Sequence, residues 1–112
     1  MSEETDALQA LLKRLRVRGI EVRCRDEALR FGATLEETLR FRGKGEKTSG
    51  HITLARGAIF RYLNEDLWWS SVAIGKMMRI DHTTVLRGIE RYKDYRAQQK
   101  KKRREEAEDE KA

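Results

Sequence analysis

Apolar residues recur at helical spacing from the start of the chain. Within the stretch TDALQALLKRLRVRG, four leucines occupy positions i, i+3, i+4 and i+7 of one helical face: Leu8, Leu11, Leu12 and Leu15. Thr5 can cap this helix at its start, and Gly19 can end it. The pattern predicts an amphipathic N-terminal helix within residues 1–21. Its leucine stripe either folds back on the rest of the chain or pairs with a second copy.

Two shorter helical patterns follow. In RCRDEALRFG, one stripe carries Cys24, Ala28 and Phe31, and Gly32 closes the pattern. In TLEETLRF, Thr34 stands three residues before Glu37, which is the spacing of a capping box. We therefore expect one helix that ends near Gly32 and a second, short helix that begins after Thr34.

A basic loop and a core helix come next. Residues 42–52, RGKGEKTSGHI, contain three glycines and show no periodicity, which predicts a loop. The cations in and beside this loop are Arg40, Arg42, Lys44 and Lys47. From Thr53 onward, apolar residues return to helical spacing at Ala55, Ala58, Ile59, Tyr62 and Leu63, so we expect a helix with one buried face.

The C-terminal part of the chain predicts two helices separated by a short break. Ser70 can cap SVAIGKMM, whose expected buried residues are Val72, Ile74, Met77 and Met78. After Arg79 and Ile80, Asp81 can cap a last helix that buries Val85, Leu86, Ile89 and Tyr92. Two helices joined by a tight turn, the second opening with polar residues, form a helix-turn-helix layout. Residues 97–112 have no apolar face, so they form either a helical extension or a disordered tail.

Composition and charge narrow the class of protein. The chain has 112 residues and no proline, which suits one small all-α domain. Its 25 Lys and Arg against 19 Asp and Glu give a net charge of +6, and such an excess indicates a polyanion partner, first of all nucleic acid. The single cysteine, the acidic N-terminus and the lack of a long apolar run favour a cytoplasmic protein with no membrane partner.

The polar run Asp-His-Thr-Thr is the candidate functional site. Consecutive helical residues point about 100° apart, so Asp81, His82 and Thr83 cannot converge on one substrate atom as a catalytic group does. The possible metal ligands Cys24, His51 and His82 lack the spacing of a metal site. We therefore expect no catalytic residue, no metal and no cofactor.

Two interpretations of the run remain. In the first, Asp81 only caps the helix and its neighbours are merely exposed. In the second, the start of the helix reads a DNA major groove: His can donate to or accept from base edges, Thr offers a hydroxyl and a methyl group, and Asp can accept from cytosine. The positive end of the helix dipole also favours a nearby phosphate.

The stretch IDHTTVLRGIERY resembles the C-terminal DNA-binding domain of the bacterial replication initiator DnaA, whose hallmark is an Arg-Asp-His-Thr-Thr-Val run followed by a helix. The similarity covers about residues 22–96, where ALRFGATLEETL, RFRGKGEKTSG, LARGAIFRYL and SSVAIGKMM are similar to the family's first two helices, basic loop, central helix and first helix of the helix-turn-helix. Met78-Arg79-Ile80 stands where the family has Gly-Gly-Arg. There is no Gly-x-x-x-x-Gly-Lys-Ser/Thr phosphate loop, so we expect no bound nucleotide.

The resemblance implies DNA contacts for particular residues. The expected base contacts in the major groove are Asp81, His82, Thr83 and Thr84. A side chain of the basic loop would enter the minor groove, with Arg42 as the first candidate and Arg40 or Lys44 as alternatives. Arg56 falls where the family binds phosphate. Charge alone assigns three further residues to phosphates: Lys76, Arg87 and Lys47.

These observations predict a protein that binds double-stranded DNA with a sequence preference, most simply a transcriptional regulator of a phage or another mobile element. One alternative is a replication accessory protein or competitor at DnaA-type origin sites. In either role we expect the protein to associate with the nucleoid. Another is a helical protein-interaction module. The adjacent Trp68 and Trp69 point in different directions, so only one is expected to reach the core and the other could contact a protein partner.

Overall fold

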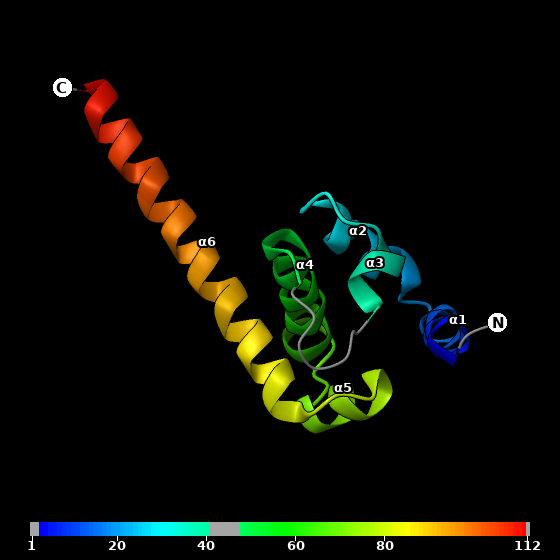
Figure 1. Cartoon of the computed structure of the whole chain (residues 1–112). Helices are drawn as coiled ribbons and strands as arrows, with labels where there is room; N and C mark the ends of the chain where they lie inside the picture. The colour runs from blue at the N-terminus through cyan, green and yellow to red at the C-terminus, as the bar shows by residue number, and fades with distance from the viewer. Residues whose placement is uncertain (1–2, 41–47, 112) are drawn as a thin grey trace.

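In the computed structural model of the chain, residues 3–40 and 48–111 are described and contain six α-helices and one π-helical turn. In chain order these are α1 (Glu3–Val17), α2 (Glu21–Leu29), α3 (Leu35–Leu39), α4 (Gly50–Arg61), the turn η1 (Tyr62–Asp66), α5 (Ser71–Met78) and α6 (His82–Lys111) (Figure 1). No strand occurs in these residues, so the all-α prediction is confirmed for the described chain.

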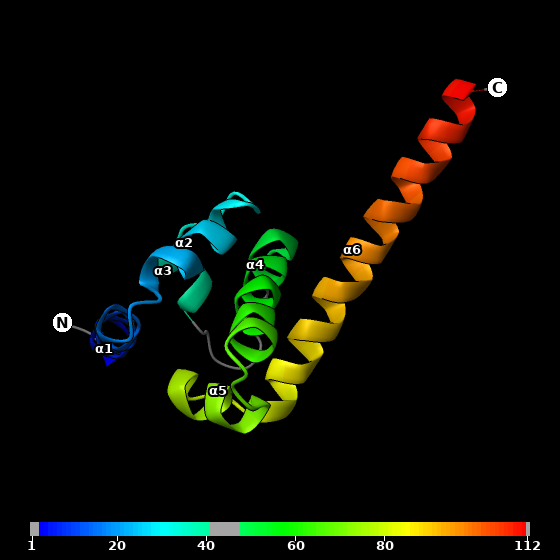
Figure 2. The same ribbon diagram turned by 180° about the vertical axis from the view of Figure 1, so that it is seen from behind.

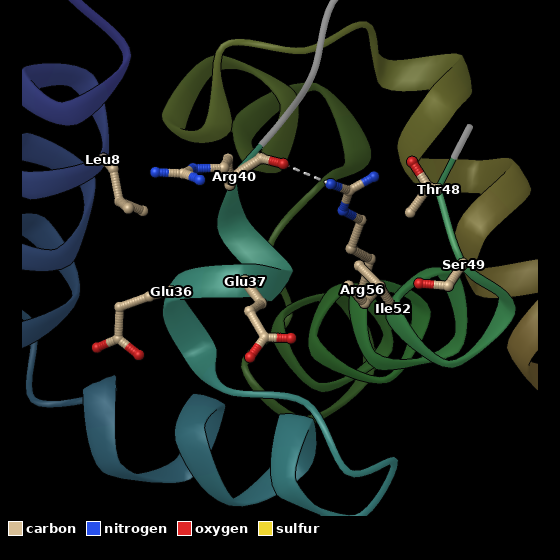
Figure 3. Close-up of a pocket in the computed structure, with 8 residues that line it drawn as sticks. All are labelled: Leu8, Glu36, Glu37, Arg40, Thr48, Ser49, Ile52 and Arg56. Atoms are coloured by element: carbon tan, nitrogen blue, oxygen red, sulfur yellow. Dashed lines mark hydrogen bonds between the residues drawn. The ribbon is translucent and has the colours of Figure 1, made fainter. Parts of the chain in front are cut away.

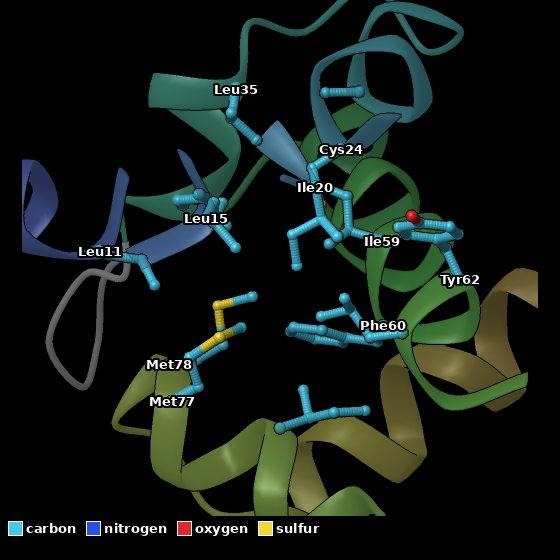
Figure 4. Close-up of a cluster of buried hydrophobic side chains, with 14 of the residues drawn as sticks. Leu11, Leu15, Ile20, Cys24, Leu35, Ile59, Phe60, Tyr62, Met77 and Met78 are labelled. Carbon is cyan, nitrogen blue, oxygen red and sulfur yellow. The ribbon is translucent and has the colours of Figure 1, made fainter. Parts of the chain in front are cut away.

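Helix α4 lies at the centre of the fold and contacts α2, α3 and α6 (Figure 1, Figure 2). Its buried side chains Ala55, Ile59 and Phe60 belong to one hydrophobic core that also includes apolar side chains from every other helix (Figure 4). Burial of one such Leu, Ile or Phe side chain stabilises a fold by about 1.5–3 kcal/mol. Cys24 is fully buried in this core, and burial, with Glu27 nearby, raises the pKa of its thiol to about 12.

Helix α1 folds back onto the rest of the chain. Its leucines at positions 11, 12 and 15 are all buried in the common core. The Arg14 guanidinium donates a hydrogen bond of 3.0 Å to the Met77 carbonyl, which ties α1 to α5. Of the two expectations for the leucine stripe, the structure therefore shows cover by the same chain.

The helix starts follow local capping chemistry. The Thr34 hydroxyl accepts a 3.1 Å hydrogen bond from the Glu37 N–H, and the Ser70 hydroxyl accepts one of the same length from Ala73 N–H, as predicted. The predicted start of α4 at Thr53 is wrong, because the helix begins at Gly50. The Ser49 carbonyl already accepts from the N–H groups three and four residues later, so the first turn includes the glycine.

Two residues expected in the core are exposed. Val72 is 47% exposed and Leu86 is 49% exposed, so both predictions of burial are wrong. Val72 lies in the first turn of α5, where that helix has little cover. Leu86 follows Val85, which is fully buried, and one helical step of about 100° turns it away from the core face.

Two further expectations are resolved in the C-terminal half. Trp69 packs against the core beneath the Arg18 guanidinium, which lies 5.2 Å from its ring, whereas Trp68 is 89% exposed. As predicted, only one indole reaches the core. Beyond the packed body, α6 continues as one helix to Lys111, so the tail is a helical extension (Figure 1, Figure 2).

The turn between α5 and α6 is tight because of Gly75. A β-carbon on this glycine would lie 2.7 Å from the Ile80 carbonyl oxygen, and the Ile80 N–H in turn donates a 2.9 Å hydrogen bond to the Gly75 carbonyl. Arg79 closes α5 in a left-handed conformation with φ of 58°, which non-glycine residues adopt at a cost. The turn places the start of α6 directly beside α5.

Candidate nucleic-acid interface

The polar run at residues 81–84 forms the exposed first turn of α6. Asp81 precedes the helix, and its Oδ1 accepts two hydrogen bonds from Thr83, one of 2.8 Å from the backbone N–H and one of 2.7 Å from the hydroxyl. These bonds, the backbone one first, hold the pKa of the Asp81 carboxyl below its usual value. Asp81 therefore caps the helix as predicted, while its side chain stays 66% exposed.

His82 is the first residue of α6 and is held only loosely. Its imidazole is 53% exposed, and its Nδ1 lies 3.5 Å from Asp81 Oδ1. Thr83 and Thr84 are also exposed. The structure thus brings the four predicted base-contacting residues together at one end of one helix, with side chains that are available to a ligand.

A cationic groove continues from this end of α6 between α4 and α6. We call it the inner groove; it has a volume of about 360 Å³ and its polar lining includes Thr53, Arg56, Thr84, Arg87 and Arg91. No carboxylate lines it among the described residues. Guanidinium and hydroxyl groups are the usual partners of phosphate oxygens, so this lining suits the backbone of a nucleic acid.

Arg91 is a residue that sequence reasoning missed. It stands four residues after Arg87 and seven after Thr84, which is the spacing that places all three on one face of α6. The helical repeat was therefore a usable signal, and only the position of α4 beside this face could show that the face lines a groove.

Arg56 has a structural task in addition to its place in the inner groove. Its Nε donates a 2.8 Å hydrogen bond to the Thr38 carbonyl, and its terminal nitrogen donates a 2.7 Å bond to the Arg40 carbonyl (Figure 3). Both acceptors belong to the end of α3, where helix carbonyls lack partners within the helix. Arg56 therefore fixes α3 to α4.

A second cavity lies on the other side of Arg56. It has a volume of about 450 Å³ and is lined by residues of both charge signs, which include Glu36, Glu37, Arg40 and Arg56 (Figure 3). Glu36 accepts hydrogen bonds from Arg25, which lower the pKa of its carboxyl. The carboxylates make this cavity a poorer place for a polyanion than the inner groove.

The remaining predicted residues are placed as follows. Arg40, at the end of α3, Lys76, in the last turn of α5, and Arg87, on α6, are all exposed. Arg42, Lys44 and Lys47 lie outside the described residues. The structure therefore brings Arg87 and Arg56 into one groove near the start of α6, and it leaves Lys76 and Arg40 outside that groove.

Within residues 3–40 and 48–111, no three His, Cys, Asp or Glu side chains gather as a metal site would require. No helix among the same residues has the length and apolar character that crossing a bilayer demands. Comparisons of the chain with protein-family models, with curated proteins and with solved structures found no match.

Proposed function

We propose that the chain binds duplex DNA with a sequence preference, and that α5 and α6 act as a helix-turn-helix whose second helix enters the major groove. The observation that carries this proposal is the exposed run of residues 81–84 at the start of α6, directly followed on the same helix by the cationic inner groove. A net charge of +6 and the resemblance to the DnaA DNA-binding domain add support.

The geometry supports a division of labour along α6. The first turn offers donors and acceptors to base edges, because both hydrogen bonds from Thr83 go to Oδ1 of Asp81 and Oδ2 keeps its capacity to accept. About one and two turns later, Arg87 and Arg91 offer guanidinium groups to phosphates. Base contacts would supply the preference, and phosphate contacts would fix the position of the helix on the duplex.

A transcriptional regulator is the simplest biological role for such a reader, since binding at a promoter needs no further activity from the chain. A replication accessory or competitor at DnaA-type origin sites is the second candidate, on the strength of the resemblance. Genome-wide footprinting separates the two, because occupied promoters support the first role and occupied origins the second.

Binding to a preferred and to a random duplex over a series of salt concentrations tests the proposal. The preferred duplex is first selected from a random pool with the wild-type protein. Each phosphate contact contributes about −0.9 to the slope of log K against log salt, so both affinities should fall steeply as salt rises. His82→Ala should weaken binding to the preferred duplex by about 5- to 150-fold and change binding to random DNA far less.

His51→Ala is the matched control, because His51 is the only other histidine and is also exposed. It should leave the ratio of the two affinities unchanged. An affinity that does not respond to salt, or an equal loss on both duplexes for His82→Ala at an unchanged melting temperature, would contradict the proposed reading role.

A further inference from the structure

A second cationic groove lies beside α6, between that helix and the end of α4. It has a volume of about 310 Å³ and its lining includes Arg61, Glu65, Tyr92, Lys93, Arg96 and Lys100. Its one carboxylate is already paired, because Glu65 contacts both Arg61 and Lys93 and these contacts, Lys93 first, lower its pKa. The charge that this groove offers to a ligand is therefore positive.

The cations of this groove continue along the extension of α6. We call the set the outer stripe: Lys93, Arg96, Lys100, Arg103 and Arg104. Their spacing, i, i+3, i+7, i+10 and i+11, places them on one side of the helix, and all five are exposed. Asp94 is the only acid of α6 between residues 93 and 104, and it lines a different pocket with Arg91.

The outer end of the stripe is not engaged elsewhere in the described residues. Lys100, Arg103 and Arg104 have no ion-pair or hydrogen-bond partner there. Lys100 lies at the edge of the groove, and the C-terminal part of α6 then extends away from the packed body (Figure 1, Figure 2). A helix that only faces solvent does not need its cations gathered on one side, because residues of both charge signs could be spread around it. Here the cations of residues 93–104 that lie on this side have no carboxylate of α6 among them.

The outer stripe and the inner groove lie on opposite sides of α6. Arg91 and Lys93 are two residues apart, which corresponds to about 200° around the helix axis. The helix, about 10–12 Å across, therefore stands between the two surfaces. A straight duplex that contacts the inner groove cannot also lie along the outer stripe.

We propose that the outer stripe binds the phosphate backbone of a second duplex DNA segment, so that one chain bridges two duplexes. From residue 93 to residue 104 the helix rises about 17 Å, which is about the rise of five phosphates along one strand. Glu105, Glu106, Glu108 and Asp109 follow and would repel phosphate, so the contact ends at Arg104. The outer stripe would contact only phosphates of this second segment, with no contact to base edges. The bridging therefore rests on the proposed function only for binding of the first duplex.

A capture experiment tests the bridging. The full chain is bound to an immobilised preferred duplex, and retention of a second, labelled random duplex is measured at several salt concentrations. Wild-type protein should retain the second duplex. Lys100→Gln/Arg103→Gln should lower that retention at least 5-fold and reduce its salt slope by about two contacts, or about 1.8. The helix outside the packed body should keep its fold in this variant.

The matched control is Lys101→Gln/Lys102→Gln, which removes the same charge from other sides of the same helical turns. It should lower retention less than 2-fold. An equal loss in both double variants would show that net charge alone matters and would overturn the proposal. The proposal is also overturned if the wild type holds the first duplex but never retains the second. It is equally overturned if Lys100→Gln/Arg103→Gln still bridges two duplexes in complexes of two or more copies, because bridging would then not need the outer stripe.

The same variants separate this inference from the proposed function. If His82→Ala leaves the preference intact but Lys100→Gln/Arg103→Gln still weakens binding of random DNA, the reading role fails and the outer stripe stands. An acidic occupant is the competing outcome. The wild type could retain polyglutamate but no second duplex, and lose that retention in Lys100→Gln/Arg103→Gln. This result would show that the outer stripe binds an acidic protein partner and not DNA.

Discussion

Gly57 on α4 and Gly88 on α6 bring two helix backbones into direct contact. A β-carbon on Gly57 would lie 2.4 Å from the Gly88 carbonyl oxygen and 2.9 Å from the β-carbon of Tyr92. A β-carbon on Gly88 would lie 2.9 Å from the Phe60 ring. Because α4 carries much of the core and α6 carries the candidate reading end, this contact sets how the inner groove is shaped.

We expect Gly57→Ala to destabilise the fold. Alanine would gain up to about 1 kcal/mol in helix propensity, but the added carbon meets backbone that must move, and overpacking of a core costs about 1–3 kcal/mol or more. The free energy of unfolding, measured by urea denaturation, should fall by about 2 kcal/mol. Gly50→Ala is the control, since no atom lies within 4 Å of its β-carbon position; its stability should be unchanged or higher.

Arg79→Gly should stabilise the protein. Arg79 has a φ of 58°, a conformation that glycine adopts without the clash between a β-carbon and the following carbonyl, so we expect a gain of about 0.5–1 kcal/mol. Lys76→Gly removes the same charge from the last turn of α5 and should instead cost up to about 1 kcal/mol, because glycine loses more backbone freedom than lysine when the helix forms. Thermal denaturation of both variants checks the opposite signs; a lower melting temperature for Arg79→Gly would contradict the conformational argument.

Substitution of Arg56 should lower both stability and DNA affinity, whereas substitution of Arg87 should lower DNA affinity alone. Arg56→Met removes the two hydrogen bonds to the end of α3, so we expect both a stability loss of about 1–3 kcal/mol and weaker DNA binding. Arg56→Lys should recover little, because one ammonium cannot reproduce the fork of a guanidinium. Arg87→Met should weaken DNA binding at an unchanged melting temperature, since Arg87 is exposed. Equal stability of the Arg56 and Arg87 variants would show that the α3 contact contributes nothing.

Asp81 should make the start of α6 sensitive to acid. Its folded pKa lies below the unfolded value because Thr83 bonds to the charged carboxylate, so the contribution to stability is complete above the unfolded pKa, about 4, and is lost as pH falls through the folded pKa. Asp81→Asn keeps a capping oxygen but loses the charge. The melting temperature of the wild type should therefore exceed that of the variant at neutral pH, and the difference should shrink below about pH 4. A difference that is constant with pH would exclude this coupling.

Local signals in the sequence predicted the starts of α3, α5 and α6 but not that of α4, and the burial of individual side chains depended on packing. Thr34, Ser70 and Asp81 cap helices through atoms two or three residues away, so their roles could be predicted from neighbouring residues alone. Leu86 follows the same apolar spacing as its buried neighbours, yet spacing cannot show how far a partner helix extends over it. Leu86 is exposed because it lies at the margin of the helix face that Val85 and Ile89 bury.

One part of the candidate site could be predicted from the sequence, and the other part depends on how the helices pack. The exposed run at residues 81–84 could be predicted because its residues are contiguous, whereas the inner groove joins α4 to a part of α6 some thirty residues away. Arg56 shows the limit most clearly. The resemblance implied a phosphate contact for Arg56, but periodicity could not place the end of α3, to which Arg56 donates two hydrogen bonds.

Because Cys24 is buried, its chemical modification reports opening of the core. The thiol is inaccessible in the core and its pKa of about 12 keeps it uncharged at neutral pH, so alkylating reagents, which attack the thiolate, cannot modify the closed protein. Because Cys24 is the only cysteine, each modified molecule records one event in which α2 separated from α4. At reagent concentrations where modification is faster than reclosing, the rate of alkylation gives the rate at which the core around Cys24 opens.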